Sequence, residues 1–207
     1  MKPRIALLDS GVNANHPHIS ENGSVLHGPA IADDGVLIDD PVPGDLIGHG
    51  TCAAAAILDL APGNTILSIR IFREEPRCSV PHLLTALEYA IGSGASWVNL
   101  SLGTTLPSES PAFEKLLIAA QEQGVILVAP AQVGGLPCFP GALADCHGVL
   151  SDDTLTRQQP EKRRHGDGEF WFASPFPREL PGLPAAANLS GVSIAAANLT
   201  GYLAAGN

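Results

Sequence analysis

The segment Ile5-Ala6-Leu7-Leu8-Asp9-Ser10-Gly11 decides the fold class of this chain of 207 residues. Four apolar residues in succession end at a turn-forming Asp-Ser-Gly, a pattern typical of a strand that is buried on both faces of a parallel sheet. Such a strand carries the next polar side chain, here Asp9, to the carboxyl edge of the sheet, where open α/β sheets bind their ligands. We therefore expect a parallel sheet with Asp9 at its functional edge.

Strands and helices alternate along the rest of the chain. We expect strands at 66–72, 97–100 and 125–129, and helices over 52–60, from Ser79 to about 91, from Ser110 to about 123, and from Ser193 onward. This alternation predicts an α/β fold, namely a single three-layer α/β/α domain over residues 1–207 with a mainly parallel, doubly wound sheet. The segment 151–169 has no periodicity, so we expect it to be a mobile surface loop.

Charge and composition exclude several classes of protein. With 11 basic and 21 acidic residues the formal net charge is −10, which disfavours binding to nucleic acid or to an anionic membrane. No uncharged apolar run approaches the roughly 18 residues that a membrane span requires. The first residues lack the apolar core of a secretory signal, and the four cysteines lack CxxC spacing. We expect reduced thiols in a cytoplasmic protein, with neither metal nor cofactor.

Three short motifs carry residues suited to nucleophilic catalysis. They are Asp9-Ser10-Gly11, Gly48-His49-Gly50-Thr51 and Ser190-Gly191-Val192-Ser193. A serine hydroxyl is a weak nucleophile until an imidazole accepts its proton, and a carboxylate is needed to orient that imidazole. Asp9 is expected at a strand end and the other two residues at helix starts. Elements of these types can converge at one edge of a parallel sheet.

These motifs, in the order Asp, His, Ser, resemble those of the subtilase family of serine endopeptidases. The resemblance extends from Ile5 to Leu203 and implies a subtilisin-like fold with Asp9, His49 and Ser193 as the catalytic triad. It also implies that an extended peptide pairs along Asn99–Gly103. From this segment Asn99, Ser101, Leu102 and Gly103 are the candidate substrate-binding residues.

Two features depart from or add to the family pattern. Ungapped alignment from Gly124 places Val133 where subtilases carry the asparagine of the oxyanion hole, so we expect the neighbouring Gln132 to supply the missing amide donor. Five aspartates between the first two motifs could bind calcium or a basic peptide, although a solvated acidic loop is favoured. These aspartates are Asp33, Asp34, Asp39, Asp40 and Asp45.

The resemblance implies a cytosolic serine endopeptidase that acts on a peptide or protein. Asp9 lies so close to Met1 that we expect no propeptide, and residues 134–138 are similar to a loop of cyanobactin-maturation proteases. In size the chain is similar to the leader peptidase that matures the quinohemoprotein amine dehydrogenase γ subunit. We therefore expect this protein to remove a leader from a precursor peptide or small modified subunit. It would act beside the enzyme that modifies that precursor. A catalytically weak binding module and a general intracellular protease remain the alternatives.

Overall fold

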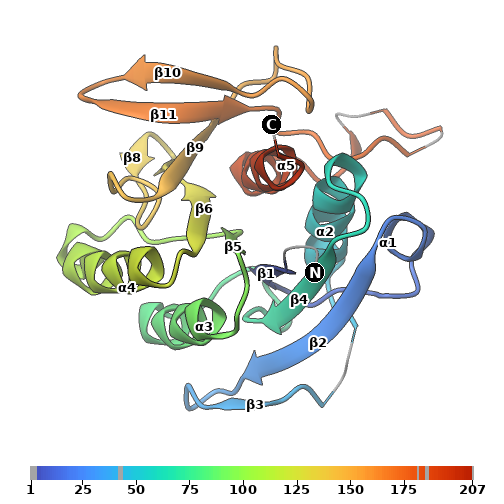
Figure 1. Ribbon diagram of the computed structural model, residues 1–207, viewed down its shortest axis with the longest axis horizontal. Helices are drawn as coiled ribbons and strands as arrows, with labels where there is room; N and C mark the ends of the chain where they lie inside the picture. The colour runs from blue at the N-terminus through green and yellow to red at the C-terminus, as the bar shows by residue number, and fades with distance from the viewer. Residues whose placement is uncertain (1–3, 42–43, 181, 185–186, 207) are drawn as a thin grey trace.

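The fold is built on β1 (Arg4–Asp9), the apolar strand identified in the sequence. The computed structural model describes residues 4–41, 44–180, 182–184 and 187–206 (Figure 1). The other strands of the main sheet are β2 (Ser24–Ile31), β3 (Leu37–Asp39), β4 (Thr65–Arg70), β5 (Trp97–Leu100), β6 (Ile126–Pro130), β9 (His147–Ser151), β10 (Glu161–His165) and β11 (Gly168–Ala173). Their order is β10-β11-β9-β6-β5-β1-β4-β2-β3, with antiparallel pairs only at the two edges. The mainly parallel sheet is therefore confirmed.

Helices cover both faces of this sheet. They are α1 (Pro17–Ser20), α2 (His49–Leu60), α3 (Val80–Gly92), α4 (Ser110–Glu122) and α5 (Val192–Ala204). In Figure 1, α3 and α4 lie on one side of the strands, whereas α2 and α5 lie on the other. A short 3-10 turn, Pro107–Glu109, leads into α4, and a separate hairpin joins β7 (Gln132–Val133) to β8 (Leu136–Pro137). The three-layer α/β/α arrangement follows.

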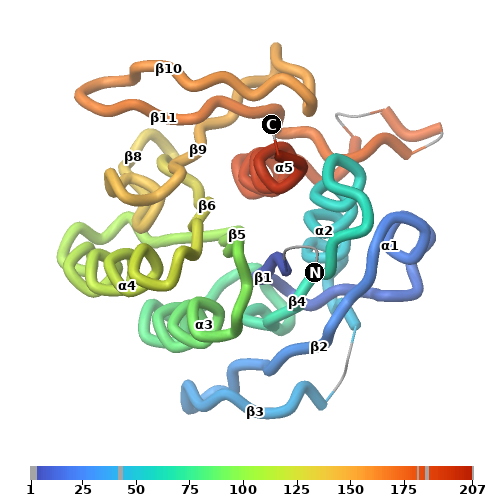
Figure 2. Tube along the Cα trace, in the orientation of Figure 1, coloured from blue at the N-terminus to red at the C-terminus, as the bar shows by residue number. Residues whose placement is uncertain are grey.

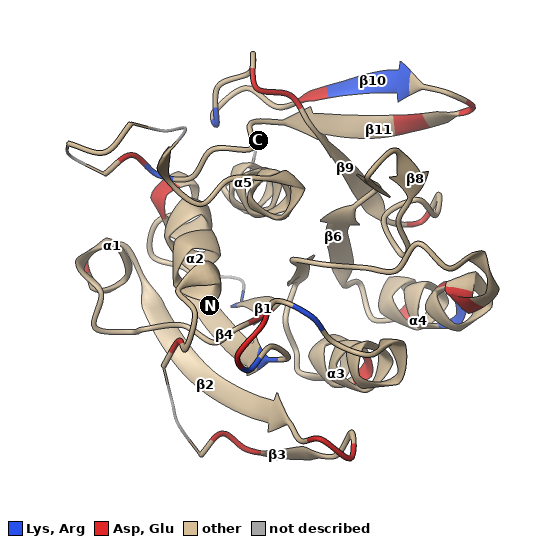
Figure 3. Cartoon of the chain, turned by 180° about the vertical axis from the view of Figure 1, so that it is seen from behind, with Lys and Arg blue, Asp and Glu red and all other residues tan. Residues whose placement is uncertain are grey.

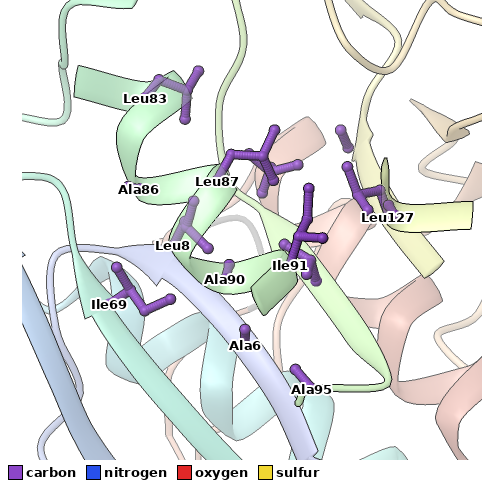
Figure 4. Close-up of a cluster of buried hydrophobic side chains, with 14 of the residues drawn as sticks. Ala6, Leu8, Ile69, Leu83, Ala86, Leu87, Ala90, Ile91, Ala95 and Leu127 are labelled. Atoms are coloured by element: carbon purple, nitrogen blue, oxygen red, sulfur yellow. The ribbon is translucent and has the colours of Figure 1, made fainter. Parts of the chain in front are cut away.

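Alternation along β1 divides the core between these two faces. Ala6 and Leu8 point toward α3 and join the cluster drawn in Figure 4. Ile5 and Leu7 point the opposite way and pack with α2 and α5. Because both faces are covered, the strand is apolar at every one of these positions, as a central parallel strand must be. This double burial holds the end of β1, and with it Asp9, in a fixed position.

The segment 151–169 corrects one expectation. It is largely a turn followed by β10 and the start of β11, which form an antiparallel hairpin attached in parallel to β9. Its strands carry no apolar alternation because β10 is an exposed edge strand, where charged side chains are tolerated and discourage pairing with other chains. Figure 3 shows this charge as the basic stretch on β10.

The carboxyl edge of the sheet has its switch point beside β1. β4 pairs with β1 on one side, and β5 pairs with β1 on the other. Ligand sites of doubly wound sheets lie where the strand order diverges in this way. Asp9 ends β1 and Ser101 follows β5, so these two side chains meet at that crevice. No helix in the described part of the chain is both long enough and apolar enough to cross a membrane.

Candidate active site

Asp9 is a deeply buried polar group of the site, with 1% of its surface exposed. One carboxylate oxygen accepts a hydrogen bond from the backbone N–H of Ser10 at 2.7 Å, and the other accepts one from the hydroxyl of Ser101. His49 Nδ1 lies 2.8 Å from Oδ2 and 2.9 Å from Oδ1. These contacts hold the carboxylate in place, so it can fix the orientation of the imidazole that faces it.

His49 links Asp9 to Ser193. His49 opens α2, and Ser193 is the second residue of α5. The Nε2 atom of His49 lies 2.9 Å from Ser193 Oγ, while the Nδ1 atom of the same ring contacts Asp9. The structure thus brings together three residues that stand 40 and 144 positions apart in the sequence. A proton can pass directly between the hydroxyl and the imidazole, which is the geometry required to activate a serine.

The surroundings of His49 adjust its pKa in opposing directions. Burial alone would lower it, but the hydrogen bond and charge of Asp9, together with the charge of Asp45, raise it above its ordinary value of 6.5. A base with a raised pKa accepts a proton more readily. It is also neutral, and so able to accept that proton, only at a higher pH.

Two glycines allow the three elements to approach each other. A Cβ on Gly50 would lie 2.1 Å from the carbonyl oxygen of Gly11, so only glycine lets the first turn of α2 pack against the chain beyond β1. Gly191 has φ +146°, a conformation that L side chains rarely adopt, and it turns the chain into α5. These positions explain the glycine that follows His49 and the one two residues before Ser193.

Asp45 joins the start of α2 to the end of β1. Its Oδ1 accepts hydrogen bonds from the hydroxyl of Ser10 at 2.8 Å and from the backbone N–H groups of Ile47 and Gly48 at 3.1 and 2.8 Å. Its Oδ2 accepts from Thr51, through the backbone N–H at 2.7 Å and the hydroxyl at 2.6 Å. The carboxylate thereby satisfies the backbone N–H of Thr51, which lacks a partner within α2, and ties the segment before the helix to its first turn.

Burial would raise the pKa of Asp45, but its hydrogen bonds with Thr51, Ser10 and Gly48 lower it below 3.8. The sequence interpretation missed this role. An acidic residue just before the first turn of a predicted helix is the signal that could have revealed it.

The other aspartates of this region are not a simple solvated loop. Asp40 forms an ion pair with Arg70 Nε at 3.0 Å, and only 8% and 4% of the two side chains are exposed. Asp33 pairs with Arg73 on the surface, where its side chain is 88% exposed. Among the described residues no group of side chains is placed to hold a metal ion. The expectation of a solvated acidic loop is therefore wrong for Asp40 and Asp45.

The structure separates the four candidate substrate-binding residues. Asn99 is fully buried, pairs within the sheet with Leu7 and Val128 on either side, and accepts a hydrogen bond from Thr200 at 2.8 Å. Both edges of β5 are occupied at this point, so no peptide can pair with Asn99, and that expectation is wrong.

The other three candidates, Ser101, Leu102 and Gly103, lie beyond the end of β5. Leu102 and Gly103 are half-buried, whereas the hydroxyl of Ser101 is engaged with Asp9. These three remain candidates for contact with an extended peptide.

Gln132 lies on the β7–β8 hairpin. Its Nε2 donates a hydrogen bond to the carbonyl of Gly135, 3.1 Å away, and no hydrogen bond joins it to Ser193 among the described residues. A primary amide carries two N–H hydrogens, so one donor remains available.

Comparison with known proteins places these features in a family. The model of the subtilase family matches residues 2–131, well over half of the chain. The chain belongs to the subtilase family. The match includes Asp9 and His49 but ends 62 residues before Ser193 (193 − 131), so Ser193 is placed by the geometry of α5 rather than by the family model.

This subtilase resembles curated relatives at 29% identity over the aligned residues. It is 29% identical to thermitase of Thermoactinomyces vulgaris over 162 residues, which cover 72% of this chain and 55% of thermitase. It is also 29% identical over 135 residues to the minor extracellular protease Vpr of Bacillus subtilis (strain 168), covering 60% of this chain and 17% of Vpr. The chain spans about half the length of thermitase.

Solved structures share the fold. The prenylagaramide maturation protease PagA is 23% identical with a TM-score of 0.68, covering 96% of this chain and 73% of PagA. A cold-adapted subtilisin-like serine proteinase is 18% identical with a TM-score of 0.71, covering 97% of this chain and 73% of that one. This likeness shows a subtilisin-like fold over nearly the whole described chain.

Proposed function

We propose that this subtilase is a serine endopeptidase that uses Asp9, His49 and Ser193 as its triad. The observation that carries the proposal is the chain of contacts from Asp9 through both ring nitrogens of His49 to Ser193 Oγ. His49 accepts the hydroxyl proton as Ser193 attacks the peptide carbonyl, then donates that proton to the departing amine. Water resolves the acyl-enzyme by the same path in reverse, while Asp9 stabilises the imidazolium.

Two donors are proposed for the oxyanion that develops during this attack. The backbone N–H of Ser193 is available because the second residue of a helix has no carbonyl partner within that helix. Gln132 supplies the other donor through the amide hydrogen that is not bound to Gly135. This pairing gives a modest oxyanion site, since the side-chain donor sits on an exposed hairpin.

The substrate is proposed to be an extended peptide that runs beside Ser101–Gly103. These residues follow β5, whose pairing with β6 ends at Asn99 and with β1 at Leu100, so the backbone edge that does not face Phe139 can pair with an added strand. Ser101 would then contribute its backbone, because its side chain supports Asp9.

The physiological reaction is proposed to be removal of a leader from a precursor peptide or small modified subunit in the cytoplasm. Two observations support this finer assignment. PagA, which shares the fold, is described as a maturation protease of prenylagaramide. The four cysteines are free thiols, which is typical of a reducing compartment. A weak oxyanion site also favours a selective enzyme, since contacts remote from the reacting bond can restore rate for one substrate.

A fluorophosphonate probe tests the catalytic proposal without a known substrate. We expect covalent labelling of Ser193, identified by mass spectrometry of the labelled peptide, and no labelling after Ser193→Ala or His49→Ala. Labelling of another residue, or of none, would contradict the triad and favour the rival function, a module that holds a precursor without cleaving it. The engagement of Gln132 with Gly135 is the observation that favours this rival.

Selectivity is tested by comparing two substrates. We expect one cleavage site in a leader-bearing precursor and negligible digestion of casein over the same period. Rapid digestion of casein at many sites would instead identify a general intracellular protease.

A further inference from the structure

A cavity of about 290 Å³ opens beside Gly48, the residue that precedes His49, and none of residues 101–104 lines it. Its walls come from four stretches, residues 13–18, 45–55, 177–180 and 188–189. Gly48, directly before His49, and Leu189, four positions before Ser193, both line it. In acyl transfer the histidine donates its proton to the departing amine, so the chain that leaves lies on the histidine side. The cavity is therefore on the path of the departing segment.

Arg178 gives one end of this cavity a positive charge that is incompletely neutralised. It is the only lysine or arginine among the described residues that line the cavity. Its Nε lies 3.4 Å from Asp59 Oδ1, but the other oxygen of that carboxylate accepts a 2.8 Å hydrogen bond from Arg157. One carboxylate thus serves two guanidinium groups. Arg178 Nη1 is buried and has no hydrogen-bond partner among the described residues.

The remaining charged groups of the cavity do not neutralise Arg178. Asp45 lies at the opposite end, where five hydrogen bonds occupy its oxygens. Thr51, which binds Asp45, and Asp59, which contacts Arg178, are eight residues apart on α2, a rise of roughly 12 Å. Burial, followed by the charges of Arg178 and His16, lowers the pKa of His18, so this histidine favours its neutral form. Apart from Asp59, which it shares with Arg157, Arg178 therefore has no carboxylate near it in the described lining of the cavity.

We propose that the Arg178 end of this cavity binds a carboxylate on the departing segment of the substrate. The direction of the segment rests on the proposed peptidase function. Asp59 is ten residues beyond His49 on α2, a rise of roughly 15 Å, and an extended peptide advances about 3.4 Å per residue. Three or four extended residues span about 10–14 Å, and the length of a side chain or terminal carboxylate covers the rest. The carboxylate consequently belongs to the third or fourth residue after the cleaved bond, either as an Asp or Glu side chain or as the chain terminus.

Binding of short peptides to the Ser193→Ala protein tests this site independently of catalysis. The probes are Gly-Gly-Gly-Glu-Gly amide and Gly-Gly-Glu-Gly-Gly amide, each compared with its Gln counterpart, and tetraglycine compared with its amide. Nuclear magnetic resonance of the His16 and His18 rings, which line the cavity, reports occupancy. We expect the better Glu peptide to bind about tenfold more tightly than its Gln counterpart, as one charge-assisted hydrogen bond allows. Preference for tetraglycine over its amide would assign the carboxylate to the chain terminus.

Variants of Arg178 complete the test. Arg178→Gln should abolish the preference for a carboxylate, Arg178→Lys should retain part of it, and Arg73→Gln, a surface arginine paired with Asp33, should leave it unchanged. Equal affinity for charged and neutral probes in the parent protein, or no binding of any probe, would overturn the proposal even if Arg178→Gln failed to fold. The two proposals can fail separately. If the cavity prefers a carboxylate but the fluorophosphonate does not label Ser193, the binding site is supported and only the peptidase function is contradicted.

Discussion

At the scale of single residues, the pKa of His49 should set the pH dependence of the proposed triad. His49 must be neutral to accept the Ser193 proton, and its pKa lies above 6.5 because the effects of Asp9 and Asp45 outweigh burial. The rate of fluorophosphonate labelling should therefore fall as the pH decreases through a midpoint above 6.5. A midpoint at or below 6.5, measured from labelling rates across a buffer series, would show that burial prevails over the two carboxylates.

Asp45→Asn should act on both the pKa of His49 and the stability of the fold. Removing the charge takes away one cause of the raised pKa, so the labelling midpoint should move to lower pH. An Asn amide nitrogen cannot accept the two hydrogen bonds that Thr51 donates to Oδ2, which should cost about 1–3 kcal/mol in the free energy of unfolding. Labelling rates and urea denaturation measure the two effects. Asp33→Asn, on an exposed side chain, is the control and should change neither quantity.

Gln132→Ala tests the proposed oxyanion donor. If the free amide hydrogen of Gln132 stabilises the oxyanion, turnover of a cleaved precursor should fall about 10²-fold, with a smaller change in KM. Gln123→Ala, at an exposed position that ends α4, should have no effect. Unchanged turnover in Gln132→Ala would leave backbone groups as the only donors.

Site residues could be predicted from the sequence where the residues next to them in the chain carry a recognisable pattern. Asp9, His49 and Ser193 were placed because each ends or begins an element whose pattern is visible along the chain. Asn99 was misjudged because its burial depends on β1 and β6, which pair with it from distant parts of the sequence. The role of Asp45 was missed because its partners include Ser10, 35 residues earlier.

At the scale of elements, Arg157 secures the turn between β9 and β10 to two helices. It donates to Asn198 Oδ1 at 2.9 Å, to Asp59 at 2.8 Å and to the carbonyl of Ala56 at 2.9 Å, with 12% of its side chain exposed. Arg157→Ala should destabilise the protein by about 2–3 kcal/mol, lowering Tm by roughly 4–12 °C in thermal unfolding. Arg164→Ala, on the exposed edge strand, should remain within about 0.5 kcal/mol of the parent.

The elements that the sequence revealed are those whose burial leaves a regular pattern. The strands β1, β4, β5 and β6 are apolar runs, and Ser79 caps α3 by accepting from the backbone N–H of His82, as its position suggests. The edge strands β3 and β10 were not predicted. Their residues are mostly exposed, so neither strand shows the alternation of apolar and polar residues that a half-buried strand has. Pairing with a neighbour, rather than a pattern of their own, makes these segments strands.

At the scale of the whole molecule, the order of strands predicts a gradient of stability from the centre of the sheet to its edges. Backbone amides of β1, β5 and β6 should exchange with solvent most slowly, because these strands pair on both sides beneath helices on both faces. Those of β3 and β10 should exchange faster. Hydrogen exchange followed by mass spectrometry measures this gradient. Unprotected exchange throughout 161–173 would contradict the hairpin and restore the loop that the sequence suggested.

The position of Ser193 on α5 has a consequence for how the protein is made. In Figure 2, α5 lies beside α2 and the strands β5, β6 and β9, all of which the ribosome produces first. Synthesis proceeds at about 5–20 residues per second, so the 144 positions between His49 and Ser193 take roughly 7–30 s. If Ser193 is the nucleophile, as we propose, the emerging chain holds Asp9 and His49 but no nucleophile during that interval. The order of synthesis would then delay the proposed proteolysis until the sheet that orients the triad has been made.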